Sequence, residues 1–267
     1  MIVDYHMHLR DREERLVHDV ETIEPYVEQA RQAGVDEIGF SEHVYYFRVT
    51  RPLWEVADQS KHCRYEIEPY VEAILEAKRQ GLPVKLGLEV DYVRGREQEM
   101  RELLAPYPWD FLLGSVHFID GLGVDGPPRL VDEVGVDEAW RRYFERLRDA
   151  AASGLFDVLS HPDLVKIFGE RVEKFDYVET AEAFARADVA VEVSTAGLRK
   201  PVGEVYPSPA FLAACQEREV PITLASDAHS SDLVGCDFGR AVELARFAGY
   251  ETVSVFDRRE RRQEPLG

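Results

Sequence analysis

Cysteines and long apolar runs are both scarce in this chain of 267 residues. Its three cysteines, Cys63, Cys215 and Cys236, are isolated, which excludes a disulfide framework or a cysteine zinc knuckle and fits a reducing compartment. No apolar run approaches the roughly 20 residues of a membrane-spanning helix. The opening MIVDYHMHL lacks the basic and apolar regions of a signal peptide. We therefore expect a cytoplasmic protein with no membrane partner.

Basic residues and asparagine are under-represented as well. Lys and Arg total 32 against 51 Asp and Glu, which gives a formal net charge of -19. Binding to nucleic-acid phosphates needs a basic surface, so we expect no nucleic-acid partner. A small anionic substrate stays compatible, because bound divalent cations reverse the local potential. Asparagine is absent altogether, as in heat-adapted proteins depleted of thermolabile amides, and thermophily is therefore a hypothesis.

The rest of the sequence alternates between short apolar runs and amphipathic stretches. The apolar runs predict strands near residues 2–5, 37–41, 84–89, 111–116, 156–160, 189–194 and 221–226, with a candidate eighth strand at 252–256. Helical periodicity lies between them, near residues 19–34, 66–81, 95–105, 137–153, 176–187, 207–219 and 238–249. Repeated strand–helix units predict parallel strands covered by helices. We therefore predict an α/β barrel that forms a single domain over residues 1–267.

One long irregular segment, residues 44–65, interrupts this alternation. It carries Tyr45, Tyr46, Phe47 and Trp54. A loop of this length in a compact domain is usually functional, often as a lid over an active site. An apolar flap packed permanently on the barrel explains the composition equally well. The segment is therefore a candidate lid loop, and both interpretations stay open.

Histidines gather where the predicted strands end. Six of the eight lie at or just past such an end, namely His6, His8, His43, His117, His161 and His229. Glu89 ends a further strand, and Asp227 precedes His229 by two residues. The carboxyl ends of all strands of a barrel meet on one face, where active sites are built. A lone histidine beside an apolar run is usually a hydrogen-bonded core residue, but that explanation would have to hold at every strand end. The set therefore predicts a multinuclear metal site.

Three local spacings support this hypothesis. His6 and His8 are two residues apart, so an extended strand presents both imidazoles on the same side. Asp227 and His229 in SDAH share that spacing after a buried-type strand. Glu89 ends KLGLE, where an ionised carboxylate is costly to bury without a partner. A carboxylate that bridges two cations offsets this cost, although a salt bridge to an arginine is the ordinary alternative.

Seven motifs in this order resemble the PHP (polymerase and histidinol phosphatase) superfamily. They are DYHMHL, SEHVYYF, GLEVDY, LLGSVHFIDG, LSHPDLVKIFG, VEVSTAGLRK and LASDAHS. The resemblance runs from His6 to His229, and GSVHFIDG and STAGLRK are the motifs most specific to the histidinol-phosphate phosphatase branch. It implies a distorted (β/α)7 barrel with a site for two to three divalent ions of zinc, manganese or iron.

The same resemblance implies how the ions share their ligands. The first would take His6, His8, Glu89 and Asp227, the second Glu89, His117 and His161, and the third His43, His229 and one more histidine. The family usually supplies that histidine shortly after His-x-His, a place occupied here by Arg10, Asp11, Arg12, Glu13 and Glu14. His18 is the best substitute, after an insertion of a few residues. Its ordinary alternative is a surface histidine at a helix N-terminus.

The activity implied by the resemblance is that of a histidinol-phosphatase, a phosphoric monoester hydrolase of histidine biosynthesis. Its substrate would be the small phosphate ester L-histidinol phosphate. Metal binding lowers the pKa of water towards about 7, so our hypothesis is attack by a metal-bound hydroxide. Glu89, Asp227 and His229 would act through the metals and the metal-bound water.

An anionic substrate also needs cationic groups near the metals. Arg199 follows a predicted strand in STAGLRK, and Lys166 follows His161 by five residues. Arginine can bind a phosphate through two hydrogen bonds, so we expect Arg199, then Lys166, to bind substrate. An ordinary exposed charge is the alternative for each. For Lys200, substrate binding and an ordinary exposed charge are equally good explanations. The oligomeric state has no clear mark in the sequence.

Other classes of protein fit part of this pattern. A different PHP-type phosphoesterase, such as a nuclease or another phosphatase, would use the same ligands. A nuclease should carry a basic track, which the composition disfavours. An amidohydrolase-type deaminase usually needs a bridging lysine, and Glu89 fills that place here. A non-catalytic regulatory barrel would be expected to have lost ligands, whereas nearly every position is filled.

Overall fold

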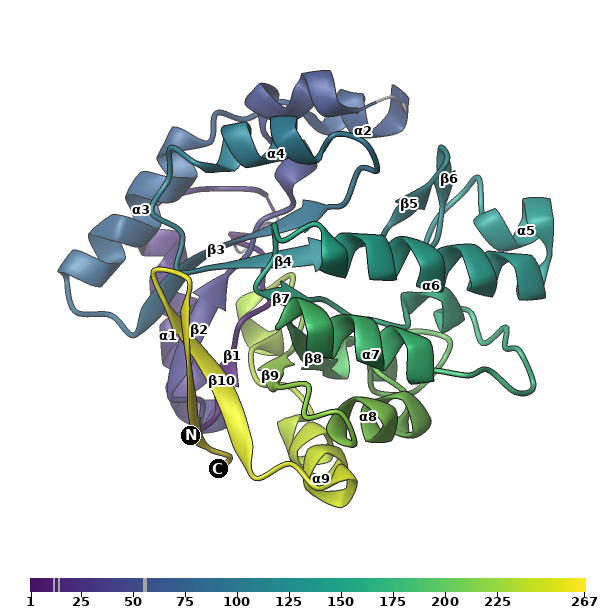
Figure 1. Cartoon of the computed structure of the whole chain (residues 1–267). Coiled ribbons are helices and arrows are strands. Elements are labelled where there is room, and N and C mark those ends of the chain that lie inside the picture. The colour runs from purple at the N-terminus through teal and green to yellow at the C-terminus, as the bar shows by residue number, and fades with distance from the viewer. Residues whose placement is uncertain (12, 14, 55–56) are drawn as a thin grey trace.

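Seven parallel strands form the centre of the molecule (Figure 1). The computed structural model describes residues 1–11, 13, 15–54 and 57–267. Neighbours in the sheet follow the chain, in the order β1-β2-β3-β4-β7-β8-β9. Their bounds are β1 Val3–Asp4, β2 Glu37–Phe40, β3 Val84–Asp91, β4 Phe111–Ser115, β7 Val158–Leu159, β8 Ala190–Ser194 and β9 Ile222–Ala225. Each of the seven predicted strands matches one of these elements.

The two edges of this sheet meet, so the strands nearly close into a barrel. The Tyr5 amide donates to the Leu224 carbonyl at 3.2 Å, and the Ala228 amide donates to the His6 carbonyl at 3.2 Å. The His8 amide then donates to the Ala228 carbonyl at 2.8 Å. This closure confirms the predicted distorted (β/α)7 barrel. It also brings the first and last histidine motifs of the chain side by side.

Helices surround the barrel (Figure 1). The first of them begins after Asp19, whose carboxylate accepts from the Thr22 amide, and ends at Gly34, whose φ of 71° suits a residue without a Cβ. The helices are α1 Val20–Ala33, α3 Glu68–Arg79, α4 Glu97–Leu104, α5 Leu130–Val134, α6 Val136–Ala152, α7 Val178–Ala187, α8 Pro209–Gln216 and α9 Phe238–Ala248. Within the described ranges, no helix combines the length and apolarity that a membrane crossing needs.

The candidate lid segment 44–65 is folded rather than irregular. It forms η1 Val44–Tyr46, η2 Arg48–Leu53 and α2 Ala57–His62. Val44 and Phe47 are fully buried, and the Thr50 hydroxyl donates to both of their carbonyls. Residues 55 and 56 of this segment lie outside the described residues, as do Arg12 and Glu14. Extensive packing of the rest favours a fixed flap, and a moving lid stays a prediction.

The candidate eighth strand exists but does not join the barrel. It is β10, Thr252–Asp257, and it pairs antiparallel with β11, Glu260–Pro265. A turn with positive φ at Arg258 and Arg259 reverses the chain directly after β10, so β11 runs back along it as its antiparallel partner. The Phe256 ring packs 6.0 Å from Tyr5 and 6.3 Å from Phe111. A second short hairpin, β5 Phe118–Ile119 with β6 Leu122–Gly123, follows β4.

Candidate metal centre

Eight of the nine predicted metal ligands converge at the carboxyl end of the barrel. Their imidazole and carboxylate atoms form four overlapping groups of three, and in each group the ligand atoms lie within 4.8 Å of one another. The groups are His6 with His8 and Asp227, His6 with Glu89 and His161, His43 with Glu89 and His117, and His8 with His43 and His229. The shared members make this one continuous cluster rather than separate sites.

Glu89 lies at the centre of the cluster, on the part of β3 that extends past β2. One carboxylate oxygen, Oε2, lies 2.5 Å from His43 Nδ1 and 3.4 Å from His6 Nε2. The other, Oε1, lies 3.1 Å from His161 Nε2 and 3.5 Å from His117 Nε2. Oε2 also lies 3.8 Å from His8 Nε2. Each oxygen therefore faces its own set of imidazoles, which is the arrangement of a bridging carboxylate.

Burial and mutual charge set the ionisation of the cluster. Burial disfavours the carboxylate of Glu89, but the surrounding imidazoles, led by His6, outweigh it and hold the pKa of Glu89 well below its usual range. Burial also opposes the protonation of His6, yet Glu192 and then Glu89 raise the pKa of His6 well above its usual value. Burial, and then the neighbouring His43, lower the pKa of His8 well below the usual range. The charges of the cluster itself thus favour an anionic Glu89, a protonated His6 and a neutral His8. A bound cation would take the place of the His6 proton.

Several ligand atoms in the cluster are buried without a hydrogen-bond partner among the described residues. They include His6 Nε2, His161 Nδ1 and both ring nitrogens of His8. The 2.5 Å contact between His43 Nδ1 and Glu89 Oε2 also lacks hydrogen-bond geometry. An unsatisfied buried polar atom costs about 1–3 kcal/mol, so such a concentration indicates missing partners. Imidazole and carboxylate together suit zinc and other divalent transition metals. The cluster therefore supports binding of divalent metal ions.

Two buried carboxylates orient the imidazoles from behind. Glu192 on β8 accepts from His6 Nδ1 at 2.9 Å, which leaves the Nε2 lone pair of His6 facing the cluster. Asp91, at the end of β3, lies 2.9 Å from His117 Nδ1 and presents its Nε2 in the same way. Both carboxylates are almost fully buried. Such carboxylate–histidine pairs commonly fix the tautomer of metal-binding histidines.

The backbone is strained at two cluster positions. His161 has a φ of 24° and Asp227 a φ of 52°, a region that residues with a Cβ rarely adopt. The other oxygen of Glu192 accepts from the His161 amide at 2.8 Å and so holds this conformation. Strained residues of this kind concentrate at functional sites, where they aim a side chain.

A cavity of about 170 Å³ opens beside the cluster. Besides Glu89 and four histidines, its wall carries Lys200, Asp125, Tyr45 and Tyr206. Lys200 and Asp125 are exposed, so the cavity offers a cation and an anion to a bound molecule. The Tyr45 ring stacks on His43, with ring centroids 4.7 Å apart. The arrangement suits a small molecule with an anionic group placed at the ligand cluster.

A family model described as the PHP domain matches residues 4–196. The chain belongs to the PHP family. A probable histidinol-phosphatase of Deinococcus radiodurans is 34% identical over 255 residues, spanning 93% of this chain and 94% of that protein. The histidinol-phosphatase of Bacillus subtilis is 25% identical, over 80% of this chain and 90% of that one. The four groups of ligand residues thus lie on a PHP chain that the Deinococcus radiodurans relative matches over 93% of its length.

Solved structures of other PHP proteins share the fold. A histidinol phosphate phosphatase of Lactococcus lactis, solved with zinc, L-histidinol and phosphate, superposes with a TM-score of 0.77 at 20% identity and covers 98% of each chain. A putative histidinol phosphatase of Listeria monocytogenes gives 0.73 at 24% identity, over 89% of this chain and 99% of that one. At these identities the likeness establishes the barrel architecture.

Three predicted site residues lie away from the cluster and the cavity wall. His18 packs between aromatic rings, 5.3 Å from Tyr70 and 5.9 Å from Phe47, and joins none of the ligand groups found among the described residues. Lys166 is fully buried, with its ammonium 2.9 Å from Asp163. Arg199 donates to the Ser226 carbonyl. His8 takes the place beside His43 and His229 that was expected of His18.

The sequence analysis missed the functional value of Asp91, Asp125 and Glu192. Asp91 follows Glu89 by two residues, and Glu192 is an acid inside the apolar run VEVS. Either position could have been recognised as a buried carboxylate in need of a partner. Asp125 had no such signal, because the β5–β6 hairpin alone brings it to the cavity.

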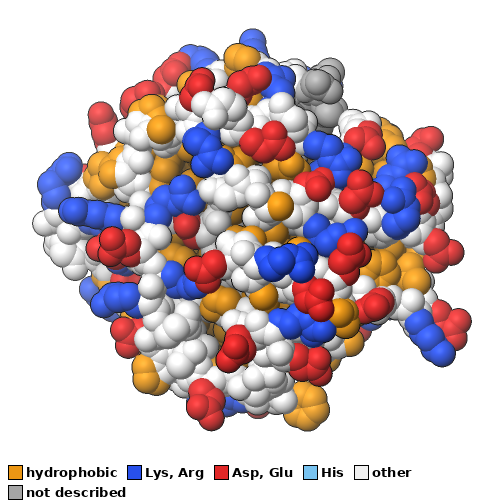
Figure 2. All heavy atoms as spheres, viewed as in Figure 1, with side chains coloured by type: hydrophobic (Ala, Val, Ile, Leu, Met, Phe, Trp, Pro, Cys, Tyr) orange, Lys and Arg blue, Asp and Glu red, His pale blue; other side chains and the backbone are white. Residues whose placement is uncertain are grey.

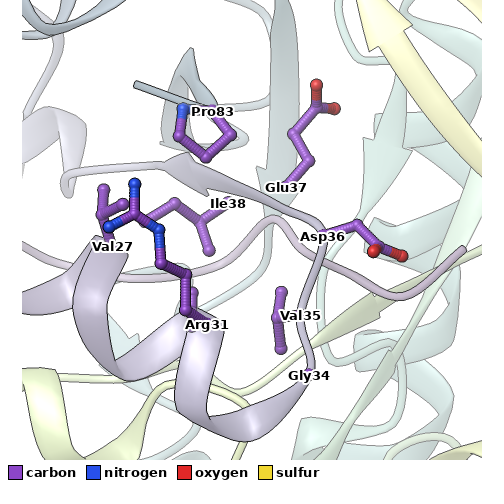
Figure 3. Close-up of a pocket in the computed structure, with 9 residues that line it drawn as sticks. Val27, Arg31, Gly34, Val35, Asp36, Glu37, Ile38 and Pro83 are labelled. Carbon is purple, nitrogen blue, oxygen red and sulfur yellow. The ribbon is translucent and has the colours of Figure 1, made fainter. Parts of the chain in front are cut away.

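A cavity of about 350 Å³ also lies at the amino end of β2 (Figure 3). Its wall carries Arg31, Asp36 and Glu37 beside the apolar Val27 and Ile38, and its described lining residues include no histidine or cysteine. Glu37 is held by Tyr5 and Lys85. The groups that suit metal chemistry are thus concentrated at the opposite end of the barrel.

Proposed function

We propose that this protein is a metal-dependent phosphatase that hydrolyses L-histidinol phosphate to L-histidinol and phosphate. The observation that carries the proposal is the cluster of eight ligand residues around Glu89, open to a cavity with one cation and one anion. Relatives named histidinol-phosphatase in Deinococcus radiodurans and Bacillus subtilis support this substrate. So does the Lactococcus lactis protein of the same fold, solved with histidinol and phosphate.

The ligand set provides for two to three ions of zinc, manganese or iron. His6, His8 and Asp227 would hold one, and Glu89 would bridge it to a second, completed by His117 and His161. The group of His8, His43 and His229 offers a place for a third. Divalent ions bound there supply a hydroxide nucleophile at neutral pH and neutralise the phosphoryl charge.

The remaining chemistry belongs to the cavity wall. The Lys200 ammonium would bind the phosphoryl oxygens, in place of the expected Arg199 and Lys166, because only Lys200 of these three lines the cavity. Asp125 would receive the positively charged amine or imidazole of histidinol. Tyr45 provides an aromatic face next to it. One cation for the anionic end and one anion for the cationic end would orient the substrate with its phosphate at the cluster.

A panel of phosphate esters, assayed with added zinc or manganese, tests this function. We expect turnover of histidinol phosphate well above that of other monoesters. Cleavage of nucleic acid would instead identify a nuclease, and no turnover with any metal would support a regulatory barrel. Glu89→Ala or Asp227→Ala should abolish activity and reduce metal content. The exposed Glu251→Ala is the control and should change neither, while full activity of Glu89→Ala would refute the proposal.

A further inference from the structure

The hydroxyl of Tyr206 is a buried polar group without a partner in the described part of the chain. Tyr206 is 1% exposed and lines the cavity beside the ligand cluster. Its ring lies 6.4 Å from that of His161. Leaving a phenol hydroxyl buried and unpaired costs about 1–3 kcal/mol, so the position indicates a partner that enters the cavity.

The surrounding structure holds this ring firmly in place. The Ser194 amide donates to the Tyr206 carbonyl at 2.7 Å, and the Tyr206 amide donates back at 2.9 Å. Gly197 leaves room for the ring, since a Cβ there would lie 2.9 Å from Tyr206 Cε2 and 2.1 Å from the Glu204 carbonyl. The Lys166 ammonium lies over the ring, 5.2 Å from its centroid. The hydroxyl is therefore preorganised.

The chemistry of the wall identifies the kind of partner. Burial raises the pKa of Tyr206 far above its usual value, so the phenol stays protonated and can donate. Lys200 lines the same cavity with a positive charge. A hydrogen-bond donor beside a cation suits the oxygens of an anion, which accept stronger hydrogen bonds than neutral groups do.

We propose that the Tyr206 hydroxyl donates a hydrogen bond to a non-bridging oxygen of the phosphoryl group, both in the substrate and in released phosphate. This role rests on the proposed phosphatase function. It also gives Lys166 a positioning role. Lys166 forms an ion pair with Asp163 and contacts the ring of Tyr206 rather than the substrate.

The test is phosphate binding by the zinc-loaded Tyr206→Phe variant, measured by titration calorimetry. A hydrogen bond to a charged group is lost, so phosphate affinity should fall roughly tenfold or more. kcat/KM should fall by a similar factor for histidinol phosphate and for p-nitrophenyl phosphate, because both share the phosphoryl group. Zinc content should stay unchanged. Tyr177→Phe, which removes a nearby hydroxyl outside the cavity, is the matched control and should bind phosphate normally.

Two results would overturn the role of Tyr206. One is unchanged phosphate affinity in Tyr206→Phe. The other is a kcat/KM loss confined to histidinol phosphate, which would place the hydroxyl at the leaving oxygen. Should the phenylalanine variant lose zinc, 3-fluorotyrosine at position 206 keeps the hydroxyl, and its ¹⁹F resonance should shift on phosphate addition; no shift would also count against the role. A wild type that neither binds phosphate nor hydrolyses histidinol phosphate would overturn the phosphatase function itself.

Discussion

Glu192 connects two histidines of the ligand cluster that are 155 positions apart in the sequence. One of its oxygens accepts from the His6 ring and the other from the His161 backbone. A single buried carboxylate thus fixes the tautomer of one imidazole and the strained backbone of another. Glu192 orients the cluster through both contacts together, because neither histidine is held in place by its own strand alone.

Replacing Glu192 by glutamine tests this arrangement. The amide keeps the volume but cannot accept from both groups with a full negative charge. We expect zinc affinity to fall about 10- to 100-fold, as for other residues that orient metal-binding histidines. Competition with a chromogenic chelator measures it, and the exposed Glu251→Gln is the control. Unchanged affinity would show that the cluster holds its shape without Glu192.

His18 tests the predicted third ligand position. Burial, and then the charge of Arg10, lower the pKa of His18 to about 4. In the unfolded chain the His18 imidazole takes up a proton near pH 6.5, whereas in the folded chain it stays neutral until about pH 4. His18 therefore destabilises the fold as the pH falls from about 6.5 towards 4, and costs nothing above that window.

The His18→Phe variant should remove this cost and fit the aromatic surroundings. In the metal-free protein, its unfolding free energy relative to wild type should rise by about 1–2 kcal/mol between pH 7.5 and pH 5. Urea unfolding at the two pH values measures the difference. Zinc content should match that of wild type. Loss of one zinc equivalent would instead support His18 as the third ligand, as the sequence analysis expected.

At the scale of elements, the turn after β8 builds one wall of the site. The 3-10 helix η4, Thr195–Arg199, brings Gly197 against Tyr206 and places Lys200 on the cavity. The motif STAGLRK was predicted to supply Arg199 to the substrate, but of its two cations only Lys200 lines the cavity. Arg199 is the last residue of η4 and donates to the Ser226 carbonyl, whereas Lys200 follows with an extended backbone, a difference that the motif does not specify.

Gly197→Ala should disturb this wall. A Cβ at 2.1 Å from the Glu204 carbonyl forces the backbone apart, so we expect a loss of about 1–3 kcal/mol in stability and weaker phosphate binding. Gly239→Ala in α9 is the control, since a Cβ there meets nothing within 4 Å, and it should be neutral or slightly stabilising. Denaturant unfolding and phosphate titration give both measurements. Equal stability of the two variants would contradict the close approach.

For the whole molecule, charge is distributed rather than concentrated. Acidic and basic side chains are interleaved on the face shown in Figure 2. Along α6, Arg141 pairs with Glu138 and Glu145, and Glu145 also pairs with Arg94. Such networks contribute more to stability at high temperature, because the free-energy cost of desolvating charges falls. They agree with the heat adaptation suggested by the missing asparagine.

We accordingly expect a melting temperature above about 65 °C, the upper end of the range common for mesophilic domains. Calorimetry of the metal-loaded protein measures it. A value within the mesophilic range would reject the thermophily hypothesis.

The local sequence determined the strands, most helices and the identity of eight clustered ligand residues. These follow from apolar periodicity and from polar residues placed at strand ends, both of which are local patterns. The strand β10 was also predicted from its apolar residues, although its antiparallel pairing with β11 was not. Because a histidine or a carboxylate lies at the end of nearly every strand, the barrel topology alone brings these side chains together at one face.

Only the tertiary structure decided which residues share a wall. Glu192 reaches His6 across the closed barrel, Asp125 arrives on a hairpin, and His18 turns into an aromatic pocket instead of the cluster. Lys166 and Lys200 carry the same charge in neighbouring motifs, yet one is neutralised inside the protein and the other faces the cavity. Such differences depend on side-chain direction and on contacts between distant segments, which a linear pattern of residue types does not contain.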